Sequence, residues 1–269
     1  MRISFLMRNV IRNKVIKTPY TIEDAKILIL GIPFVSKHFG SLPDSKNAPK
    51  SIREYFDYFY EYDDDHNHDI YDIPFYDVGN VKVKQKNYQK TKEIVLNVLR
   101  ELKMINSNAK FIFLGGDHLI TPMVVEALKP RNLVSLDAHL DLLENVKEYE
   151  HACAMRYVYE TCKNITIQGY RDVLKSEIDF TLKNGIRISR DLNFRGIVDY
   201  LSIDVDVLDY IYATTSSPVA FGFRPEDVVK IIRRSEFKFA DIVEWSPPHG
   251  FPAIVKIFRE LLLRMNSLH

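Results

Sequence analysis

The sequence lacks most features of secreted, membrane and nucleic-acid-binding proteins. Its 269 residues include only two cysteines, Cys153 and Cys162, which are too few for a disulfide framework. No apolar run is long enough to cross a bilayer. The formal net charge of +1 gives no reason to expect nucleic acid or an anionic membrane as a partner. We therefore expect a reduced, cytoplasmic protein with packed thiols.

The first 22 residues contain no acid and are basic. The positive residues before Glu23 are Arg2, Arg8, Arg12, Lys14 and Lys17. The apolar stretch 3–7 is too short for a secretory signal, and Arg8 interrupts it. We predict a loosely docked leader over residues 1–22, with a basic amphipathic targeting segment as the alternative.

Short runs of β-branched residues alternate with stretches of helical period. The runs that predict strands are 26–31, 110–114, 132–136, 164–168, 200–205 and 239–244. The stretches that predict helices are 48–60, 84–102, 121–128, 173–183, 225–234 and 253–265. No repeat or Gly/Ser/Pro-rich linker divides the chain. The alternation predicts a single-domain, three-layer α/β/α fold over residues 1–269, with a mainly parallel sheet.

Three segments place metal-binding side chains just after predicted strands, where function collects in sheets of this kind. They are GGDH at 115–118, DAHLD at 137–141 and DVD at 204–206. Side chains two residues apart in an extended segment point to one side, so the last two segments should each converge. The candidate metal ligands are four aspartates and two histidines: His118, Asp137, His139, Asp141, Asp204 and Asp206.

Four buried aspartates would repel one another unless cations balanced them. Oxygen-rich ligation with some imidazole and no cysteine suits manganese better than zinc or copper. Any one segment alone is typical of a helix cap or a salt bridge, but the three together favour a pair of divalent metal ions. The run DDDHNHD at 63–69 has no comparable geometry. It is interpreted as a solvated acidic loop, with cation binding as the alternative.

Together these segments resemble the three metal motifs of the ureohydrolase family, which includes arginase and agmatinase. The third motif extends over SIDVDVLD at 202–209, and HACAMR at 151–156 resembles archaeal agmatinase-like members. Weaker similarities lie at 31–34, 48–54 and 77–81, so the resemblance covers most of the chain.

The resemblance implies two Mn²⁺ ions per chain and a homo-oligomer, either a trimer or a hexamer. One ion would be held by His118, Asp137, Asp141 and Asp204. The other would be held by His139, Asp137, Asp204 and Asp206, so that Asp137 and Asp204 bridge.

The resemblance also implies hydrolysis of a guanidino compound to an amine and urea. Metal ions lower the pKa of bound water from about 16 to about 7, and Asp141 would orient the resulting hydroxide. His151 matches the family's proton-shuttle histidine, with a surface loop histidine as the alternative. Glu244 matches the glutamate that grips the guanidinium, with a salt bridge as the alternative. We also predict that Asn145 contacts the substrate together with Glu244 and His151.

Agmatine, cleaved to putrescine and urea, is the predicted substrate. The loop 142–150 contains Glu144, Glu148 and Glu150 against one lysine, Lys147, and an acidic rim disfavours a substrate carboxylate. Arginine or another guanidino acid is the nearest alternative.

Two segments depart from agmatinase-like sequences and leave the substrate open. Residues 210–218 replace a Pro- and Gly-containing stretch, and His-Ala-Cys at 151–153 stands where many relatives have His-Gly. A non-catalytic metal-binding member of the fold and a single-zinc deacetylase are further alternatives. The complete set of ligands, with His151 and Glu244, argues against both.

Overall fold

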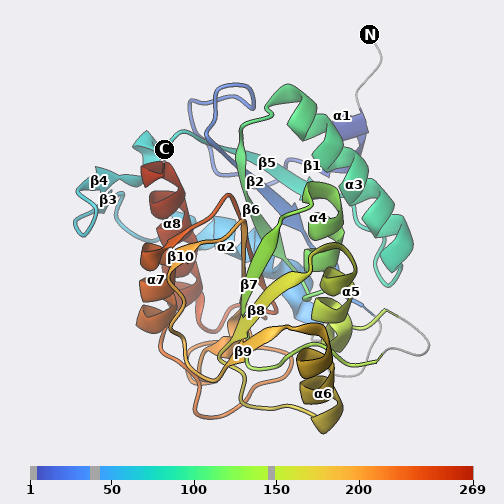
Figure 1. Cartoon of the computed structure of the whole chain (residues 1–269). Coiled ribbons are helices and arrows are strands. Elements are labelled where there is room, and N and C mark those ends of the chain that lie inside the picture. The colour runs from blue at the N-terminus through green and yellow to red at the C-terminus, as the bar shows by residue number, and fades with distance from the viewer. Residues whose placement is uncertain (1–4, 37–42, 145–148, 269) are drawn as a thin grey trace.

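A nine-stranded sheet forms the middle of three layers in the computed structural model, which describes residues 5–36, 43–144 and 149–268 (Figure 1). Across the sheet the order is β1 (Val10–Ile11), β5 (Phe75–Val81), β2 (Ile27–Ile32), β6 (Lys110–Gly115), β13 (Phe239–Val243), β11 (Tyr200–Asp204), β7 (Asn132–Leu136), β8 (Asn164–Gln168) and β9 (Arg187–Ser189). Only the β1–β5 pairing in this sheet is antiparallel. The predicted three-layer, mainly parallel fold is confirmed.

Helices cover both faces of the sheet (Figure 1). On one face lie α2 (Ala48–Phe56), α7 (Pro225–Arg234) and α8 (Phe251–Ser267). On the other lie α1 (Phe5–Asn9), α3 (Tyr88–Ile105), α4 (Ile120–Leu128), α5 (Ala154–Thr161) and α6 (Lys175–Asn184). In β2, Ile27 and Ile29 join the first core while Leu28 and Leu30 join the second, which is why this strand is apolar throughout. No helix in the described part of the chain is long and apolar enough to span a membrane.

The smaller elements lie outside the main sheet. They are the strand pairs β3 (Tyr62–Asp63) with β4 (His68–Asp69) and β10 (Gly196–Ile197) with β12 (Ser235–Glu236), and the 3-10 helices η1 (Pro43–Asn47), η2 (Ile70–Asp72), η3 (His151–Cys153) and η4 (Val205–Val207).

All six predicted strands and all six predicted helices are present; 132–136, 164–168 and 225–234 match the predicted bounds, and the other elements have shifted ends. The helix predicted from residue 84 begins at Tyr88 because Asn87 caps it, its Oδ1 accepting from Lys90 N at 3.1 Å. Strand β5 was not predicted, since Asp77 and Gly79 interrupt its apolar pattern. The buried guanidinium of Arg53 explains how the strand tolerates Asp77, because Arg53 Nε lies 2.7 Å from Asp77 Oδ2.

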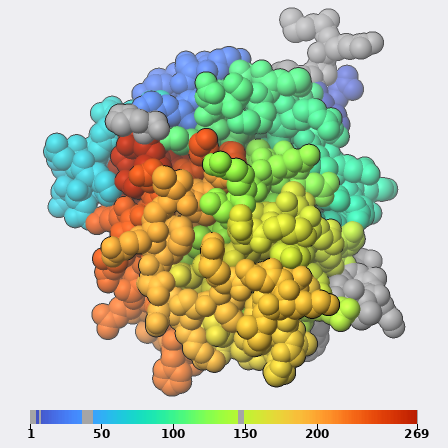
Figure 2. Space-filling model, viewed as in Figure 1, coloured from blue at the N-terminus to red at the C-terminus, as the bar shows by residue number. Residues whose placement is uncertain are grey.

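Two segments are more firmly held than we expected from the sequence. In place of a loosely docked leader, Phe5 N and Leu6 N donate to the Glu101 carboxylate at 2.9 and 2.7 Å, and β1 extends the sheet. Residues 62–69, where we predicted a solvated acidic loop, form the β3–β4 hairpin at the left edge of the molecule (Figure 2), with Asp64, Asp65 and Asn67 exposed as predicted. There Asp63 is 7% exposed, because Lys256 Nζ in α8 donates to its carboxylate at 2.6 Å.

Candidate metal centre and active site

The candidate site lies at the carboxyl ends of four neighbouring strands, β6, β13, β11 and β7. The chain passes from β6 to β7 and later inserts β11 and β13 between them, so segments distant in sequence end side by side. Asp204 is the last residue of β11 and pairs with Val243, and Glu244 follows immediately. Such a point is where ligands bind in open α/β sheets.

The second and third motifs converge through turns, and the extended alternation that we predicted is wrong. Asp137 follows β7, and its Oδ1 accepts from His139 N at 2.7 Å within a bend. Asp141 adopts a left-handed backbone with φ +50°. Asp204 Oδ1 accepts from Asp206 N at 2.9 Å and so caps the 3-10 helix η4. Side chain to backbone hydrogen bonds of this kind favour turns over a continued strand.

The first group of ligand-type side chains surrounds the imidazole of His118. Its Nδ1 lies 2.9 Å from Asp141 Oδ2, 3.2 Å from Asp204 Oδ2 and 3.4 Å from Asp137 Oδ2. One ligand atom from each of the four residues lies within 4.8 Å of the others, and all four side chains are buried. The first predicted ligand set is therefore brought together.

The second group consists of Asp137, His139 and Asp206. His139 Nδ1 lies 2.8 Å from Asp206 Oδ2 and 3.9 Å from Asp137 Oδ1. Asp137 thus belongs to both groups, as predicted for a bridging carboxylate. Asp204 is the other predicted bridging residue. With ligand atoms required to lie within 4.8 Å of one another, it belongs only to the first group.

Several pKa values in this cluster are shifted because the side chains are buried and the carboxylates lie close together. Burial and then the carboxylates of Asp206, Asp141 and Asp204 raise the pKa of Asp137 well above its ordinary value. Burial and then Asp206 do the same to the pKa of Asp204. Burial lowers the pKa of His139, but the carboxylate of Asp206 outweighs it and raises the pKa to about 10. Without metal, these shifts favour the protonated forms of Asp137, Asp204 and His139. For Asp206, burial raises the pKa, but the hydrogen bond with His139 outweighs it and lowers the pKa.

A buried polar chain orients His118 from behind. His118 Nε2 lies 3.2 Å from Ser202 Oγ, which donates to Asp241 Oδ1 at 2.7 Å. Asp241 Oδ2 accepts from the hydroxyls of Thr121 and Tyr200 at 2.6 and 2.7 Å. Since the single hydroxyl proton of Ser202 goes to Asp241, Ser202 accepts from His118 Nε2–H, and Nδ1 faces the carboxylates.

Glu244 lies beside this cluster in a strained backbone conformation, φ +65°. Its Oε1 accepts from His118 N at 2.7 Å and its Oε2 accepts from the Ser216 hydroxyl at 2.6 Å. Ser216 belongs to the stretch 210–218 that departs from agmatinase-like sequences, so this stretch contributes directly to the site.

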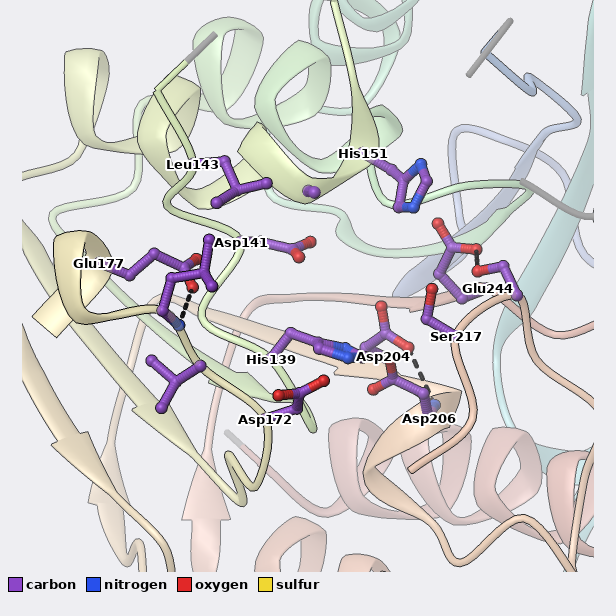
Figure 3. Close-up of a pocket in the computed structure, with 14 residues that line it drawn as sticks. His139, Asp141, Leu143, His151, Asp172, Glu177, Asp204, Asp206, Ser217 and Glu244 are labelled. Carbon is purple, nitrogen blue, oxygen red and sulfur yellow. Dashed lines mark hydrogen bonds and ion pairs between the residues drawn. The ribbon is translucent and has the colours of Figure 1, made fainter. Parts of the chain in front are cut away.

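His151 enters the pocket from the opposite side, with its imidazole facing Glu244 (Figure 3). Burial lowers the pKa of His151, but the negative charges of Glu244, Asp141 and Asp117 raise it above its ordinary value. The predicted substrate contact Asn145, like Lys147 and Glu148 of the same loop, lies outside the described residues.

The pocket is acidic on several sides (Figure 3). Six carboxylates line it: Asp141, Asp172, Glu177, Asp204, Asp206 and Glu244. Leu143, Val173 and Leu174 add apolar surface, and among the described residues no lysine or arginine lines the pocket.

Sequence reasoning missed several residues that build the site. Glu177 is buried, and its carboxylate accepts from Leu142 N and Leu174 N, both at 3.0 Å. Arg171 donates to the carbonyl oxygens of Asp206 and Val207 at 2.8 and 3.1 Å, fixing the third metal motif. Of the two, only Arg171 lies close after a strand, three residues beyond β8, whereas Glu177 lies in the first turn of α6.

Asp117 belongs to the first motif, but we predicted no role for it. Its carboxylate accepts from Ser36 N and Leu119 N at 2.6 and 3.2 Å and so holds the turn that presents His118. Burial and the nearby charge of Glu244 raise the pKa of Asp117 to about 7.

The cluster at the strand ends fits a metal site, and His151 and Glu244 line the pocket beside it. The model of the arginase family matches residues 25–263. The chain therefore belongs to the arginase family, which confirms the predicted family and enzyme class.

Similar proteins cover most of the chain. An N(1)-aminopropylagmatine ureohydrolase of Thermococcus kodakarensis is 35% identical over 243 residues, 82% of this chain and 83% of that protein. An agmatinase of Pyrococcus horikoshii is 31% identical over 243 residues, 84% of this chain and 85% of that protein. Among solved structures, the agmatine ureohydrolase of Thermoplasma volcanium superposes with a TM-score of 0.82 at 25% identity, covering 96% of each chain.

Proposed function

We propose that the protein is a binuclear manganese hydrolase that cleaves agmatine to putrescine and urea. The observation that carries the proposal is the cluster beside Glu244 of four buried aspartates, buried His118 and partly buried His139. Among the described residues that line the pocket, no lysine or arginine balances the carboxylates. A buried acidic cluster without a protein cation is stable as carboxylates only with bound cations.

The donor atoms fit metal ions. Asp137 Oδ2 is buried and has no hydrogen-bond partner among the described residues. His118 donates through Nε2 to Ser202, so that its neutral form would present the lone pair of Nδ1 to a metal ion held among the same three carboxylates. Neutral imidazole and carboxylate oxygen in this ratio suit manganese.

Two overlapping sets of residues would hold the two ions. One set is His118, Asp137, Asp141 and Asp204, and the other is Asp137, His139 and Asp206 with Asp204 adjacent. When bound, such ions supply hydroxide near neutral pH, which the weakly electrophilic guanidinium carbon requires.

The remaining chemistry belongs to Glu244 and His151. Glu244, fixed by His118 N and Ser216, binds the substrate guanidinium through charge-assisted hydrogen bonds. His151 faces this position across the pocket (Figure 3). As the C–N bond breaks, His151 donates its proton to the departing amine nitrogen, for which its raised pKa suits it.

The pocket favours a substrate with a cationic tail. Its acidic lining repels an α-carboxylate such as that of arginine and attracts an ammonium group, while Leu143, Val173 and Leu174 can cover methylene groups. N(1)-aminopropylagmatine is a second candidate, because a relative that acts on it is 35% identical and Asp172 adds a further carboxylate at the exposed side of the pocket.

Urea release in the presence of Mn²⁺ tests the proposal. The substrates to compare are agmatine, N(1)-aminopropylagmatine, arginine and 4-guanidinobutyrate. We expect urea from agmatine or its aminopropyl derivative and little from the two acids. Preference for arginine would overturn the substrate assignment, and no urea from any of the four would overturn the proposed reaction.

A further inference from the structure

The reach of His151 into the pocket depends on how its short 3-10 helix is anchored. On its C-terminal side, Leu143 N donates to Ala152 O at 3.1 Å. One turn later, Arg156 N donates to Asp141 O at 3.2 Å. The main chain after His151 is therefore fixed to the second metal motif.

On its N-terminal side the anchor is a group of rings that we call the tyrosine cluster: Tyr88, Tyr149 and Tyr157. Tyr149 stacks on Tyr88 of α3, with ring centroids 4.0 Å apart and an interplanar angle of 14°. It also contacts Tyr157 of α5 at 5.0 Å between centroids, and Gln89 donates to its hydroxyl. Tyr149 is thus held by two helices at once.

We infer that Tyr149 is a positioning residue that acts through His151. It precedes His151 by two residues, and it is not among the described residues that line the pocket. Loss of its ring would release the main chain on one side of His151 while leaving the ligand-type residues in place. Misplacement of a reacting group by about 1 Å can cost roughly 100-fold in rate. The inference rests on the proton-transfer role proposed for His151.

The test is a double-mutant cycle on the manganese-loaded enzyme with agmatine, using Tyr149→Ala and His151→Asn. We expect Tyr149→Ala to lower kcat by about tenfold or more with KM within about twofold, since the ring touches no substrate. In the His151→Asn background, we expect the same substitution to leave kcat within about twofold. A loss that depends on His151 is not produced by a general loss of packing.

Further variants distinguish the contribution of the Tyr149 ring from that of its hydroxyl and from a general disturbance of helix α5. Tyr149→Phe keeps the stack and should retain kcat within about twofold. Tyr159→Ala on the same helix α5, where Tyr159 contacts Phe180 at 5.6 Å, should leave kcat unchanged. Tyr149→Leu replaces Tyr149→Ala if the smaller side chain prevents folding.

Two results would overturn the inference in distinguishable ways. Equal loss of kcat from Tyr149→Ala in both backgrounds would overturn the positioning role alone. Full activity of His151→Asn would remove the proposed proton transfer, and the role of Tyr149 with it.

Discussion

Two groups of four aspartates and two histidines occur in this molecule, and they differ in what surrounds them. One is contiguous within residues 63–69 and lies in the β3–β4 hairpin. The other is assembled from the ends of β6, β7 and β11. By composition alone the two groups are equal candidates for a cation site.

In the hairpin, protein cations pair with two of the four aspartates, Asp63 and Asp65. Asp63 pairs with Lys256, and Arg233 pairs with both Asp65 and Glu260. His66 lies between Asp63 and Glu260, at 2.9 and 3.0 Å, through different ring nitrogens. These side chains are already satisfied, and their bonds attach the hairpin to α7 and α8.

At the strand ends, by contrast, the aspartates pair with two histidines, His118 and His139, in place of lysine or arginine. The pKa of Asp137 is raised while the pKa of Asp63, although burial opposes the shift, is lowered to about 2 by Lys256 and His66. A structural network and a candidate metal site therefore differ in whether protein cations pair with the carboxylates, and not in the number of acidic residues.

The largest expected effect is loss of activity at the strand-end group. Asp204→Asn should lower kcat/KM by roughly 1,000-fold or more, since bound metal supplies several kcal/mol of transition-state stabilisation. Asp63→Asn should leave kcat/KM nearly unchanged because its partners are protein cations. Urea release with Mn²⁺ measures both, and comparable losses would erase the distinction between the two groups.

The same contrast applies to two buried glutamates. Glu260 pairs with Arg233, whereas Glu244 accepts hydrogen bonds from two neutral donors of the described chain, His118 N and the Ser216 hydroxyl. Glu244→Gln should lower kcat/KM for agmatine by about 10- to 100-fold, mostly through KM, because a charge-assisted bond is lost. Glu260→Gln should lower Tm with KM unchanged. A normal KM in Glu244→Gln would remove Glu244 from guanidinium binding.

In the metal-free protein, neutralising one aspartate should change the free energy of unfolding in opposite directions for the two groups. Asp137→Asn removes one of several repelling carboxylates and should raise the free energy of unfolding by about 1 kcal/mol. Asp63→Asn removes a paired carboxylate and should lower it by about 1–2 kcal/mol. Denaturant unfolding in EDTA measures both changes. Destabilisation by Asp137→Asn would show that the cluster is balanced without metal.

The smallest expected effect is a difference in pH dependence. Raised folded pKa values, such as those of Asp137, Asp204 and His139, stabilise the metal-free protein below the unfolded pKa and lose this contribution as pH rises. Metal-free stability should therefore fall between pH 5 and pH 9, while stabilisation by Mn²⁺ grows. Asp63, with its lowered pKa, should lose its contribution only as pH falls from about 4 to about 2. The free energy of unfolding, measured at several pH values with Asp63→Asn as the control, tests both pH ranges.

Local patterns were sufficient to predict six strands, six helices and the six ligand-type residues, because each motif directly follows a buried strand, but they did not predict β5 or α5. The partners of the hairpin were not predictable, since Lys256 lies 193 positions from Asp63. The positive φ values of Asp141 and Glu244 could not be predicted from the sequence either, because residues other than glycine disfavour this conformation and adopt it only in the context of the fold. For the same reason the sequence did not reveal Arg171 or Glu177, whose roles depend on segments that meet only in the fold.

Manganese titration of the metal-free protein by calorimetry, with metal content measured in parallel, tests the central claim most directly. The account predicts two Mn²⁺ ions per chain in the wild type. It predicts at most one in Asp137→Asn, because Asp137 belongs to both ligand groups. Asp63→Asn should retain two. A single tightly bound zinc ion, no bound metal, or two ions bound equally tightly in Asp137→Asn would contradict the account.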